Sequence, residues 1–327
     1  MDAIKMKTVV EILRAYYELG LSQEEIAQQQ HLSKSKVNRI IKKAISDGYI
    51  KITIDYPVTP VQDLEEAFIR EFGLKKAFIA PVVVDDPEMI CKDVCRALAH
   101  DLPAIVKDDD IIGLSWGNTL RVLSGFLEKT ERNGVKVVQL NGGIARNTKS
   151  TKSLEIIEAF ADAFQGIGFI LPLPAIVDNS LIVDVLKKDS QIGEVFDLIE
   201  KCRIALFGIG SVSYESVLYS AKYFKREEYE ELQKKGAVGD ICSRYYDING
   251  KVVDQTLDAR TIGISRETMK KKEYSIGVAT GEQKVKAILG ALNGGYINTL
   301  YSDENTAREV LRLYYGQLNR QKLKRKS

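Results

Sequence analysis

The chain has 327 residues, 45% of them hydrophobic, and carries a net charge of only +2 at pH 7. This length excludes one small domain and predicts two or more, with enough apolar material for a real core. The near-neutral charge excludes a nucleic-acid surface that covers the whole molecule, so any basic contact with DNA must be local.

The four cysteines, Cys91, Cys95, Cys202 and Cys242, are scattered, and no neighbouring histidine or second cysteine pair completes a zinc set. We interpret them as free thiols of a reducing cytosol, and we expect no metal or other cofactor. No segment has the apolar run of a signal peptide or a membrane span. The expectation is therefore a cytoplasmic protein with no membrane partner.

Residues 22–48 predict two short helices joined by a tight turn. Ser22 is a favoured N-cap, and Glu25 three residues later completes a capping box. The turn is at His31–Leu32, and Ser33 caps the second helix. Such a pair, with a basic second helix, is typical of a DNA-reading helix-turn-helix.

The second of these helices has two different faces. Val37, Ile40, Ile41 and Ile45 recur at helical spacing and predict its buried stripe. On the other face, asparagine and arginine can each make paired hydrogen bonds with a purine edge, whereas lysines further along meet phosphates. The candidate DNA-binding residues are Ser33, Lys34, Ser35, Lys36, Asn38, Arg39, Lys42 and Lys43. The alternative interpretation is an amphipathic helix pair with a solvated basic face.

Two further elements complete the expected N-terminal domain. A supporting helix precedes the pair, with an inner face made of Val9, Val10, Leu13, Tyr16, Tyr17 and Leu19. Residues 49–54 predict a following strand, as in a winged arrangement. Two prolines within 56–60 disfavour helix and indicate a linker. We therefore expect a DNA-binding domain over 1–55, a linker over 56–60 and a larger domain over 61–327.

In the larger domain, strand and helix patterns alternate. Apolar runs predict strands at 76–83, 110–115, 135–140, 168–172, 204–209, 275–279 and 299–301. Helical patterns fall at 61–73, 88–103, 117–131, 151–164, 180–188, 191–200, 225–236, 282–292 and 303–318. This alternation indicates a doubly wound α/β domain, in which ligands bind beyond the carboxyl ends of the strands.

Four loops after predicted strands have the chemistry of a ligand site. Loop 113–120 opens a helix, so its N–H groups, side-chain donors and helix dipole can hold an anion such as phosphate; a simple capped turn is the equal alternative. Loops 141–143 and 207–211 offer glycines for close approach or for turns. In loop 279–284, Lys284 can reach an anion or be an ordinary surface lysine.

Two residues between these loops are further candidates. Asp240 can accept hydrogen bonds from sugar hydroxyls, and Arg260 can pair with an anion or brace a loop; a turn role for the aspartate is the commoner alternative. The candidate effector-binding residues are Ser115, Trp116, Gly117, Asn118, Thr119, Asn141, Gly142, Gly143, Gly210, Asp240, Arg260 and Lys284.

Catalysis finds weak support in the sequence. His31 and His100 are the only histidines, and no Ser/His/Asp set or nucleophile elbow can be assembled in the larger domain. Acid–base work by carboxylates and lysine, as in sugar-phosphate isomerases, remains chemically possible. We expect a protein that senses a ligand rather than one that converts it.

At the level of motifs, the chain resembles the SorC family of bacterial transcriptional regulators over essentially its full length. The marks are LSQEEIA…LSKSKVNRIIKKA, GLSWGNTL (113–120), VVQLNGG (137–143), LFGIGS (206–211), VGDICSRYYD (238–247), DARTIGI (258–264) and GEQKVKAILGAL (281–292). The family joins a helix-turn-helix to a sugar-phosphate-sensing domain whose fold is similar to glucosamine-6-phosphate deaminase and ribose-5-phosphate isomerase. The VVQLNGG, LPLP and GDICSRYYD segments look most like the deoxyribonucleoside regulator branch, whose effector is deoxyribose 5-phosphate.

The resemblance also implies roles for individual residues. Trp116, Gly117, Asn118, Thr119 and Lys284 would hold the effector phosphate, with Asp240 near the sugar. Arg260 is a weaker match. The chain departs from the pattern at Asn141, where the deoxyribonucleoside branch has a lysine that forms an imine with the sugar aldehyde; an asparagine cannot do so.

The resulting hypothesis is a DNA-binding transcriptional regulator that represses a sugar or nucleoside catabolic operon. It would bind a near-palindromic double-stranded operator as a homodimer or homotetramer, under control of a phosphorylated sugar. The alternative from another class is an isomerase- or deaminase-like enzyme with an accessory DNA-binding domain. A third alternative is a DNA-binding scaffold with a vestigial pocket.

Overall fold

The computed structural model describes residues 3–50, 61–143 and 152–324, with side chains over 6–50, 61–143 and 152–320. The chain divides into two compact units, Met1–Pro57 and Val58–Ser327. The expected linker at 56–60 and residues 51–54 of the expected wing strand lie outside the described residues. Tyr49 and Ile50, which begin that predicted strand, are not in a strand.

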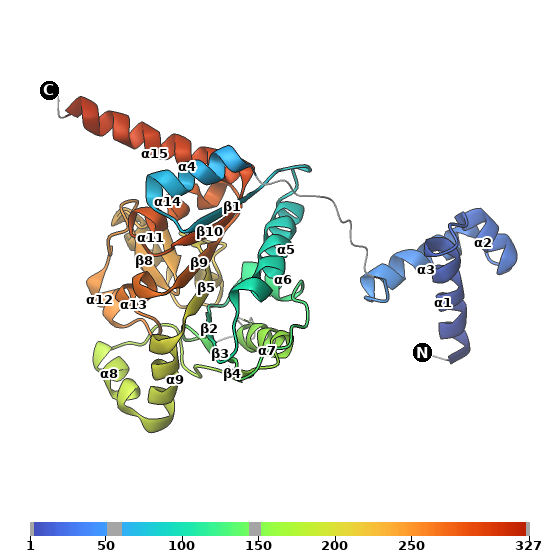
Figure 1. The fold of residues 1–327 in the computed structure, drawn as a ribbon, viewed down its shortest axis with the longest axis horizontal. Helices are drawn as coiled ribbons and strands as arrows, with labels where there is room; N and C mark the ends of the chain where they lie inside the picture. The colour runs from blue at the N-terminus through green and yellow to red at the C-terminus, as the bar shows by residue number, and fades with distance from the viewer. Residues whose placement is uncertain (1–2, 51–60, 144–151, 325–327) are drawn as a thin grey trace. The chain divides into compact units, whose positions relative to one another are not determined.

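The N-terminal unit contains α1 (Ala3–Tyr17), α2 (Gln23–Gln29) and α3 (Lys34–Ser46) (Figure 1). Their shared core includes Ile12 and Leu13 of α1, Ile26 of α2, and Val37 and Ile41 of α3. The small Ala27 is also buried there, which allows the helices to cross closely. The predicted helix-turn-helix is therefore present in the structure.

The predicted inner faces of two of these helices were partly wrong. In α3, Ala44 is buried and Ile45 is 43% exposed, because residue 45 lies about 80° round the helix from Val37. In the supporting helix, Val10 and Tyr17 are exposed, and Leu19 lies beyond the last residue of α1.

The larger unit is built on a seven-stranded parallel sheet, with strand order β1-β10-β9-β5-β2-β3-β4. The strands are β1 (Lys76–Ala80), β2 (Ile111–Leu114), β3 (Lys136–Gln139), β4 (Ile167–Phe169), β5 (Ile204–Gly208), β9 (Tyr274–Val278) and β10 (Thr299–Asp303). Alternate residues of β5 enter different cores: Ile204 and Leu206 face one layer, Ala205 and Phe207 the other. Burial on both faces explains the continuous apolar runs of the sequence.

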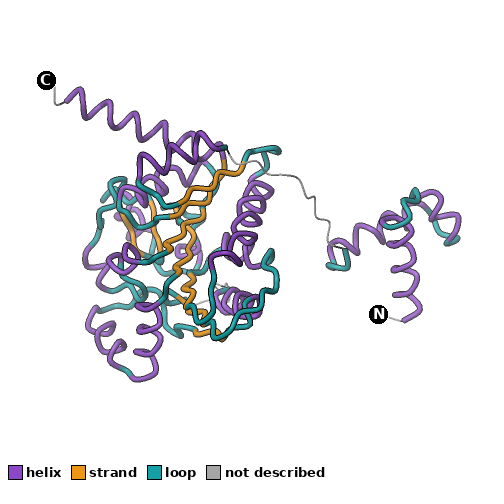
Figure 2. The backbone as a smooth tube through the Cα atoms, in the orientation of Figure 1, coloured by secondary structure: helices purple, strands orange, loops and turns teal. Residues whose placement is uncertain are grey.

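Helices cover both faces of this sheet (Figures 1 and 2). One layer contains α5 (Pro87–Ile105), α6 (Asn118–Ser124) and α7 (Ser153–Ala163). The other contains α4 (Gln62–Phe72), α8 (Ser180–Lys188), α9 (Ser190–Lys201), α13 (Arg266–Lys271), the 3-10 helix η1 (Glu282–Lys284), α14 (Val285–Asn293) and α15 (Glu304–Lys324). The predicted doubly wound α/β architecture is confirmed.

A second, antiparallel sheet has the order β6-β7-β8 and was not predicted. It comprises β6 (Gly210–Ser211), β7 (Gly239–Ile241) and β8 (Arg244–Tyr246). Three helices accompany it, α10 (Val217–Ser220), α11 (Arg226–Lys234) and α12 (Gln255–Ala259), and Leu218, Tyr229, Leu232 and Leu257 form a small core beneath them.

Three predicted helices differ from the structure. The helix expected over 303–318 continues to Lys324 as α15. The helix expected over 117–131 ends at Ser124, and the chain then turns so that the backbone N–H of Thr130 donates to the carbonyl of Ala163. The helix expected over 282–292 begins as the 3-10 turn η1 and becomes α-helical at Val285.

Candidate functional site: a basic recognition helix and a polar cavity

The backbone of the helix-turn-helix is held by caps at both helix starts. Ser22 Oγ accepts a hydrogen bond from the N–H of Glu25, and Glu25 Oε2 accepts one from the N–H of Ser22 at 2.8 Å, so the predicted capping box is present. Ser33 Oγ accepts from the N–H of Lys36 at 3.2 Å. His31 has a left-handed φ of 50° between the two helices, which produces the tight turn.

The face of α3 that points away from the small core is basic and open to solvent. Exposed on it are Lys34, Ser35, Lys36, Arg39, Lys42 and Lys43, with Asn38 half-buried beside them. Lys34 pairs with Glu24 of α2 at 3.2 Å, an exposed contact of little energetic weight. The seven side chains thus form one accessible surface that suits a DNA groove.

The larger unit contains a cavity of about 310 Å³. Its walls come from the loops after β2, β3, β5 and β9, together with β7 and the start of α10. On one side of β2 the sheet continues with β3 and then β4. On the other side of β2 it continues with β5, β9, β10 and β1. The cavity therefore lies where a doubly wound sheet binds ligands, at the carboxyl ends of strands beside the point where the strand order reverses.

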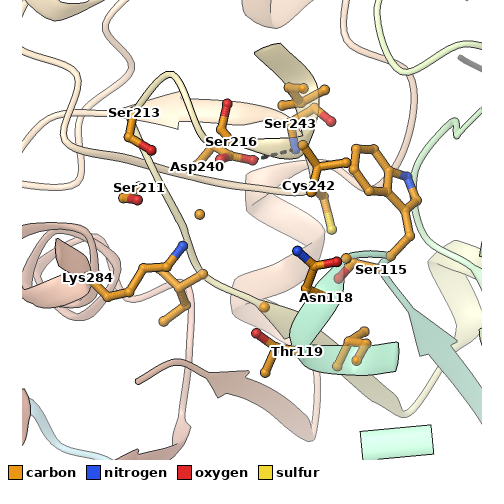
Figure 3. A pocket seen from close by; sticks show the side chains of 18 of the residues that line it. Ser115, Asn118, Thr119, Ser211, Ser213, Ser216, Asp240, Cys242, Ser243 and Lys284 are labelled. Atoms are coloured by element: carbon orange, nitrogen blue, oxygen red, sulfur yellow. Dashed lines mark hydrogen bonds between the residues drawn. The ribbon is translucent and has the colours of Figure 1, made fainter. Parts of the chain in front are cut away.

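Three side chains with hydrogen-bond donors line this cavity from two elements, α6 and η1. Asn118 and Thr119 stand in the first turn of α6, which follows Gly117 and has no side-chain cap. Gly117 has a φ of 137°, in the region that favours glycine. Figure 3 shows the Lys284 ammonium pointing into the same space from η1. We call Asn118, Thr119 and Lys284 the donor group.

Asp240 of β7 brings an opposing charge to the cavity. Burial raises the pKa of its carboxyl to about 6, although Lys284 and the N–H of Ser243 both act to lower it. Burial also lowers the pKa of the Lys284 ammonium, and Asp240 acts against that change. Each group is therefore a partly desolvated charge that an added hydrogen-bonding ligand stabilises.

Ser243 joins two of the cavity residues. Its N–H donates to Asp240 Oδ2 at 3.1 Å (Figure 3), and its Oγ accepts from Nδ2 of Asn141 at 3.2 Å. Ser243 and Cys242 form the two-residue turn between β7 and β8, with φ values of 67° and 51°. Two non-glycine residues in this conformation are unusual and cost about 1–3 kcal/mol each, a type of strain that clusters at ligand sites.

Two buried polar atoms of the cavity wall have no hydrogen-bond partner among the residues that the structure describes. They are Oγ of Ser115, whose side chain is 5% exposed, and Oδ1 of Asn141, in a residue that is 2% exposed. A buried polar atom without a partner is unfavourable by about 1–3 kcal/mol. A polar ligand in the cavity supplies the missing partners.

Most of the effector-binding residues predicted from the sequence line this one cavity, namely Ser115, Trp116, Gly117, Asn118, Thr119, Asn141, Gly210, Asp240 and Lys284. Gly142 and Gly143 are not in its wall. Gly142 instead lies against the backbone of Pro174, where a β-carbon would be 2.2 Å from the carbonyl oxygen, and it accepts a hydrogen bond from Trp116 Nε1.

Arg260 also lies elsewhere. It lines a separate depression beside α11 and donates to the carbonyl of Val177 at 3.1 Å. The structure therefore does not bring Arg260 to the cavity that contains the donor group.

The cavity also contains residues outside the predicted set, among them Ser213, Glu215, Ser216, Cys242 and Ser243, and two more from the predicted loop 279–284, Thr280 and Gln283. Ser243 is three residues from Asp240 in the VGDICSRYYD segment, so its closeness in sequence to a candidate residue could have indicated it. The serines at 213 and 216 follow a two-residue strand and gave no periodic pattern.

Comparisons with known proteins agree with this division into two units. A winged helix-turn-helix DNA-binding family matches residues 9–51, and the family described as "Putative sugar-binding domain" matches residues 56–312. The deoxyribonucleoside regulator of Bacillus subtilis is 37% identical over 311 residues, covering 95% of this chain and 99% of that protein. The sorbitol operon regulator of Klebsiella pneumoniae is 30% identical over 311 residues, covering 94% of this chain and 98% of that protein.

A solved structure extends the likeness to three dimensions. The full-length sorbitol operon regulator SorC from Klebsiella pneumoniae has a TM-score of 0.72 and 30% identity, with coverage of 95% of this chain and 99% of that one. Fold, recognition helix and matches together define a DNA-binding transcriptional regulator with a sugar-binding domain, a class of regulators rather than enzymes. More particularly, the chain belongs to the SorC family of transcriptional regulators.

Among the described residues, none of the helices combines the length and apolar character that crossing a membrane requires.

Proposed function

We propose that this regulator represses a sugar or nucleoside catabolic operon in the cytoplasm and responds to a phosphorylated sugar, such as deoxyribose 5-phosphate, bound in the cavity. The proposal includes a homodimer or homotetramer and a near-palindromic operator. The names of relatives, a deoxyribonucleoside regulator and a sorbitol operon regulator, support the class of operon.

The observation that carries the ligand class is that one cavity contains both a cationic donor group and hydrogen-bond acceptors. The donor group suits the oxygens of a phosphate, since Lys284 brings a positive charge and Asn118 and Thr119 bring side-chain donors. In the same cavity, the Asp240 carboxylate and Asn141 Oδ1, which has no partner among the described residues, suit hydroxyl groups. A phosphorylated sugar has both kinds of group within one small molecule.

The oligomer follows from the size of the basic surface. The basic face of one α3 helix offers six exposed polar or basic side chains on a chain whose net charge is only +2. Such a patch gathers few phosphate contacts, so two recognition helices one DNA turn apart are needed for tight, sequence-specific binding.

A thermal-shift and calorimetric screen tests the ligand class. We expect deoxyribose 5-phosphate, ribose 5-phosphate or glucose 6-phosphate to raise the melting temperature of the full chain, whereas the unphosphorylated sugars do not. Lys284→Met should weaken the best ligand at least tenfold, because a buried charge-assisted contact is lost. The matched control is Lys286→Met on α14, whose side chain does not line the cavity.

The same screen separates the other hypotheses. Saturable binding without product formation supports a sensor, whereas steady conversion of the sugar phosphate by pure protein would support the enzyme alternative. No melting shift with any sugar phosphate would support the vestigial pocket and refute the proposal.

A further inference from the structure

We propose that Asn141 and Asp240, joined by Ser243, read hydroxyl groups of the ligand, so that the sugar is held reversibly through its hydroxyls and not through its carbonyl carbon. This inference rests on the proposed function and specifies how the same cavity selects its ligand. We call these three residues the hydroxyl-reading group.

The position of Asn141 is fixed by its backbone. Residue 141 follows β3 and forms an isolated bridge with Gly263, and its carbonyl accepts a hydrogen bond from Gln139 Nε2 at 2.7 Å. A β-carbon at Gly263 would lie 2.7 Å from Cα of Asn141, so only glycine allows this approach. The side-chain amide is consequently held in the cavity wall in one place.

Of the two polar atoms of the Asn141 amide, one has a hydrogen-bond partner and the other does not within the described residues. Nδ2 donates to Ser243 Oγ, while Oδ1 is buried and finds no partner within the described part of the chain. A hydroxyl group of the ligand can donate a hydrogen bond to Oδ1. If the amide is rotated so that Nδ2 faces the cavity instead, the same hydroxyl can accept from Nδ2. A carbonyl oxygen of the ligand only accepts, so it is a poorer match for Oδ1.

Asp240 adds a second acceptor, joined to Asn141 through Ser243. Its Oδ2 accepts from the N–H of Ser243, and the other oxygen lies against Gly210. The strained Cys242–Ser243 turn thus lets one residue, Ser243, hydrogen-bond to both the Asn141 amide and the Asp240 carboxylate. Two neighbouring acceptors suit two neighbouring hydroxyls of a polyol chain or sugar ring.

Covalent capture at this point is chemically excluded, because an amide nitrogen is not a nucleophile that forms an imine. Lys284 is the one lysine among the described residues that line the cavity, and it belongs to the donor group. The ligand class is therefore a polyhydroxylated phosphate ester, and its reduced alditol form fits as well as the aldose.

Isothermal titration calorimetry on the full chain tests this inference with three probes. The first is whichever of deoxyribose 5-phosphate, ribose 5-phosphate and glucose 6-phosphate binds most tightly. The second is the alditol phosphate made from it by borohydride reduction, and the third is inorganic phosphate, followed by ³¹P NMR. The variants are Asn141→Leu, Ser243→Ala and, as the matched control in the donor group, Asn118→Leu.

We expect the alditol phosphate to bind within about tenfold of the aldose phosphate. Asn141→Leu should weaken the binding of the aldose phosphate and of the alditol phosphate at least tenfold. It should change the binding of inorganic phosphate less than twofold, because the Asn141 amide contacts the hydroxyl groups of the ligand and not its phosphate. Ser243→Ala should act in the same direction with a smaller effect, whereas Asn118→Leu should weaken all three probes. A misfolded variant would lose all three together, so the selective loss separates recognition from folding.

Three results would overturn the inference while leaving the proposed function intact. They are loss of binding on reduction to the alditol, equal affinity of the sugar phosphate for the native chain and Asn141→Leu, and sugar phosphates that bind no tighter than inorganic phosphate. If none of the sugar phosphates binds, the proposed function fails and this inference fails with it.

Discussion

The carboxylate of Asp240 lies directly against the α-carbon of Gly210: a β-carbon at position 210 would be 2.0 Å from Asp240 Oδ1. The two residues face each other across the β6–β7 ladder. This contact explains why a glycine follows β5 at the cavity, and it makes residue 210 a sensitive test of the position of Asp240.

Gly210→Ala should displace Asp240 and weaken the sugar phosphate at least tenfold, with a loss of stability of about 1–3 kcal/mol from overpacking. Calorimetric titration and urea unfolding measure the two effects. Gly316→Ala is the control, because a β-carbon there would lie more than 4 Å from every non-adjacent atom that the structure describes outside its own helix backbone. Unchanged affinity in Gly210→Ala would show that the position of Asp240 does not matter for the ligand.

Asp240 should also leave a signature in the pH dependence of stability. Burial raises the pKa of its carboxyl from 3.8 to about 6, so the folded state binds this proton more readily than the unfolded chain does. The stability contributed by Asp240 is then greatest below pH 4 and is lost as the pH rises to 6, by up to about 3 kcal/mol.

Asp240→Asn removes this titration. We expect the free energy of unfolding of the variant, minus that of the native chain, to increase from pH 4 to pH 6 and to level off above it. Chemical denaturation at several pH values measures this difference. A difference independent of pH would mean that the carboxyl titrates normally in the folded protein.

On the DNA side, Arg39→Ala should abolish the choice of operator sequence and leave sugar-phosphate binding unchanged. Loss of a bidentate base contact is worth about 1–3 kcal/mol. Competition between operator and random duplexes measures the effect. Arg14→Ala, at an exposed arginine of α1 that pairs with Glu18, is the control. Sequence-specific binding by Arg39→Ala would refute the assignment of α3 as the recognition helix.

Lys42 tests the division between affinity and specificity on the same helix. Its exposed ammonium is expected to meet a phosphate, so Lys42→Ala should weaken operator and random DNA alike. The slope of log affinity against log salt concentration should decrease by about 1. If instead the variant discriminates less between operator and random DNA, Lys42 contacts a base.

The sequence predicted those parts of the molecule that have a local physical cause. The capping box of Ser22 and Glu25 is a short-range pattern, and the parallel sheet follows from apolar runs such as that of β5. The loops after β2 and β9 could be found because strand, glycine and helix start stand next to one another. These features indicate the loops of Asn118 and Lys284 as candidate ligand loops, and the family resemblance assigns both residues to the effector phosphate.

Other parts depend on contacts between distant segments. The strands β6, β7 and β8 have two or three residues each, too few for a periodic pattern. The left-handed turn at Cys242–Ser243 lacks the asparagine or glycine that usually indicates one. Gly142 was predicted to contact the ligand because it follows a strand. The packing that requires a glycine there is against the backbone of Pro174, 32 residues away in sequence, and no local pattern indicates that contact.

We propose that this one chain couples operator binding to sugar-phosphate binding, and thermodynamic linkage between the two ligands tests this coupling most directly. The measurement is the affinity of the best sugar phosphate for the full chain, with and without a saturating operator duplex selected by the pure protein. If the ligand changes operator affinity by some factor, the operator must change ligand affinity by the same factor, which we expect to be roughly 5- to 150-fold. Equal ligand affinity in the presence and absence of operator would contradict the account.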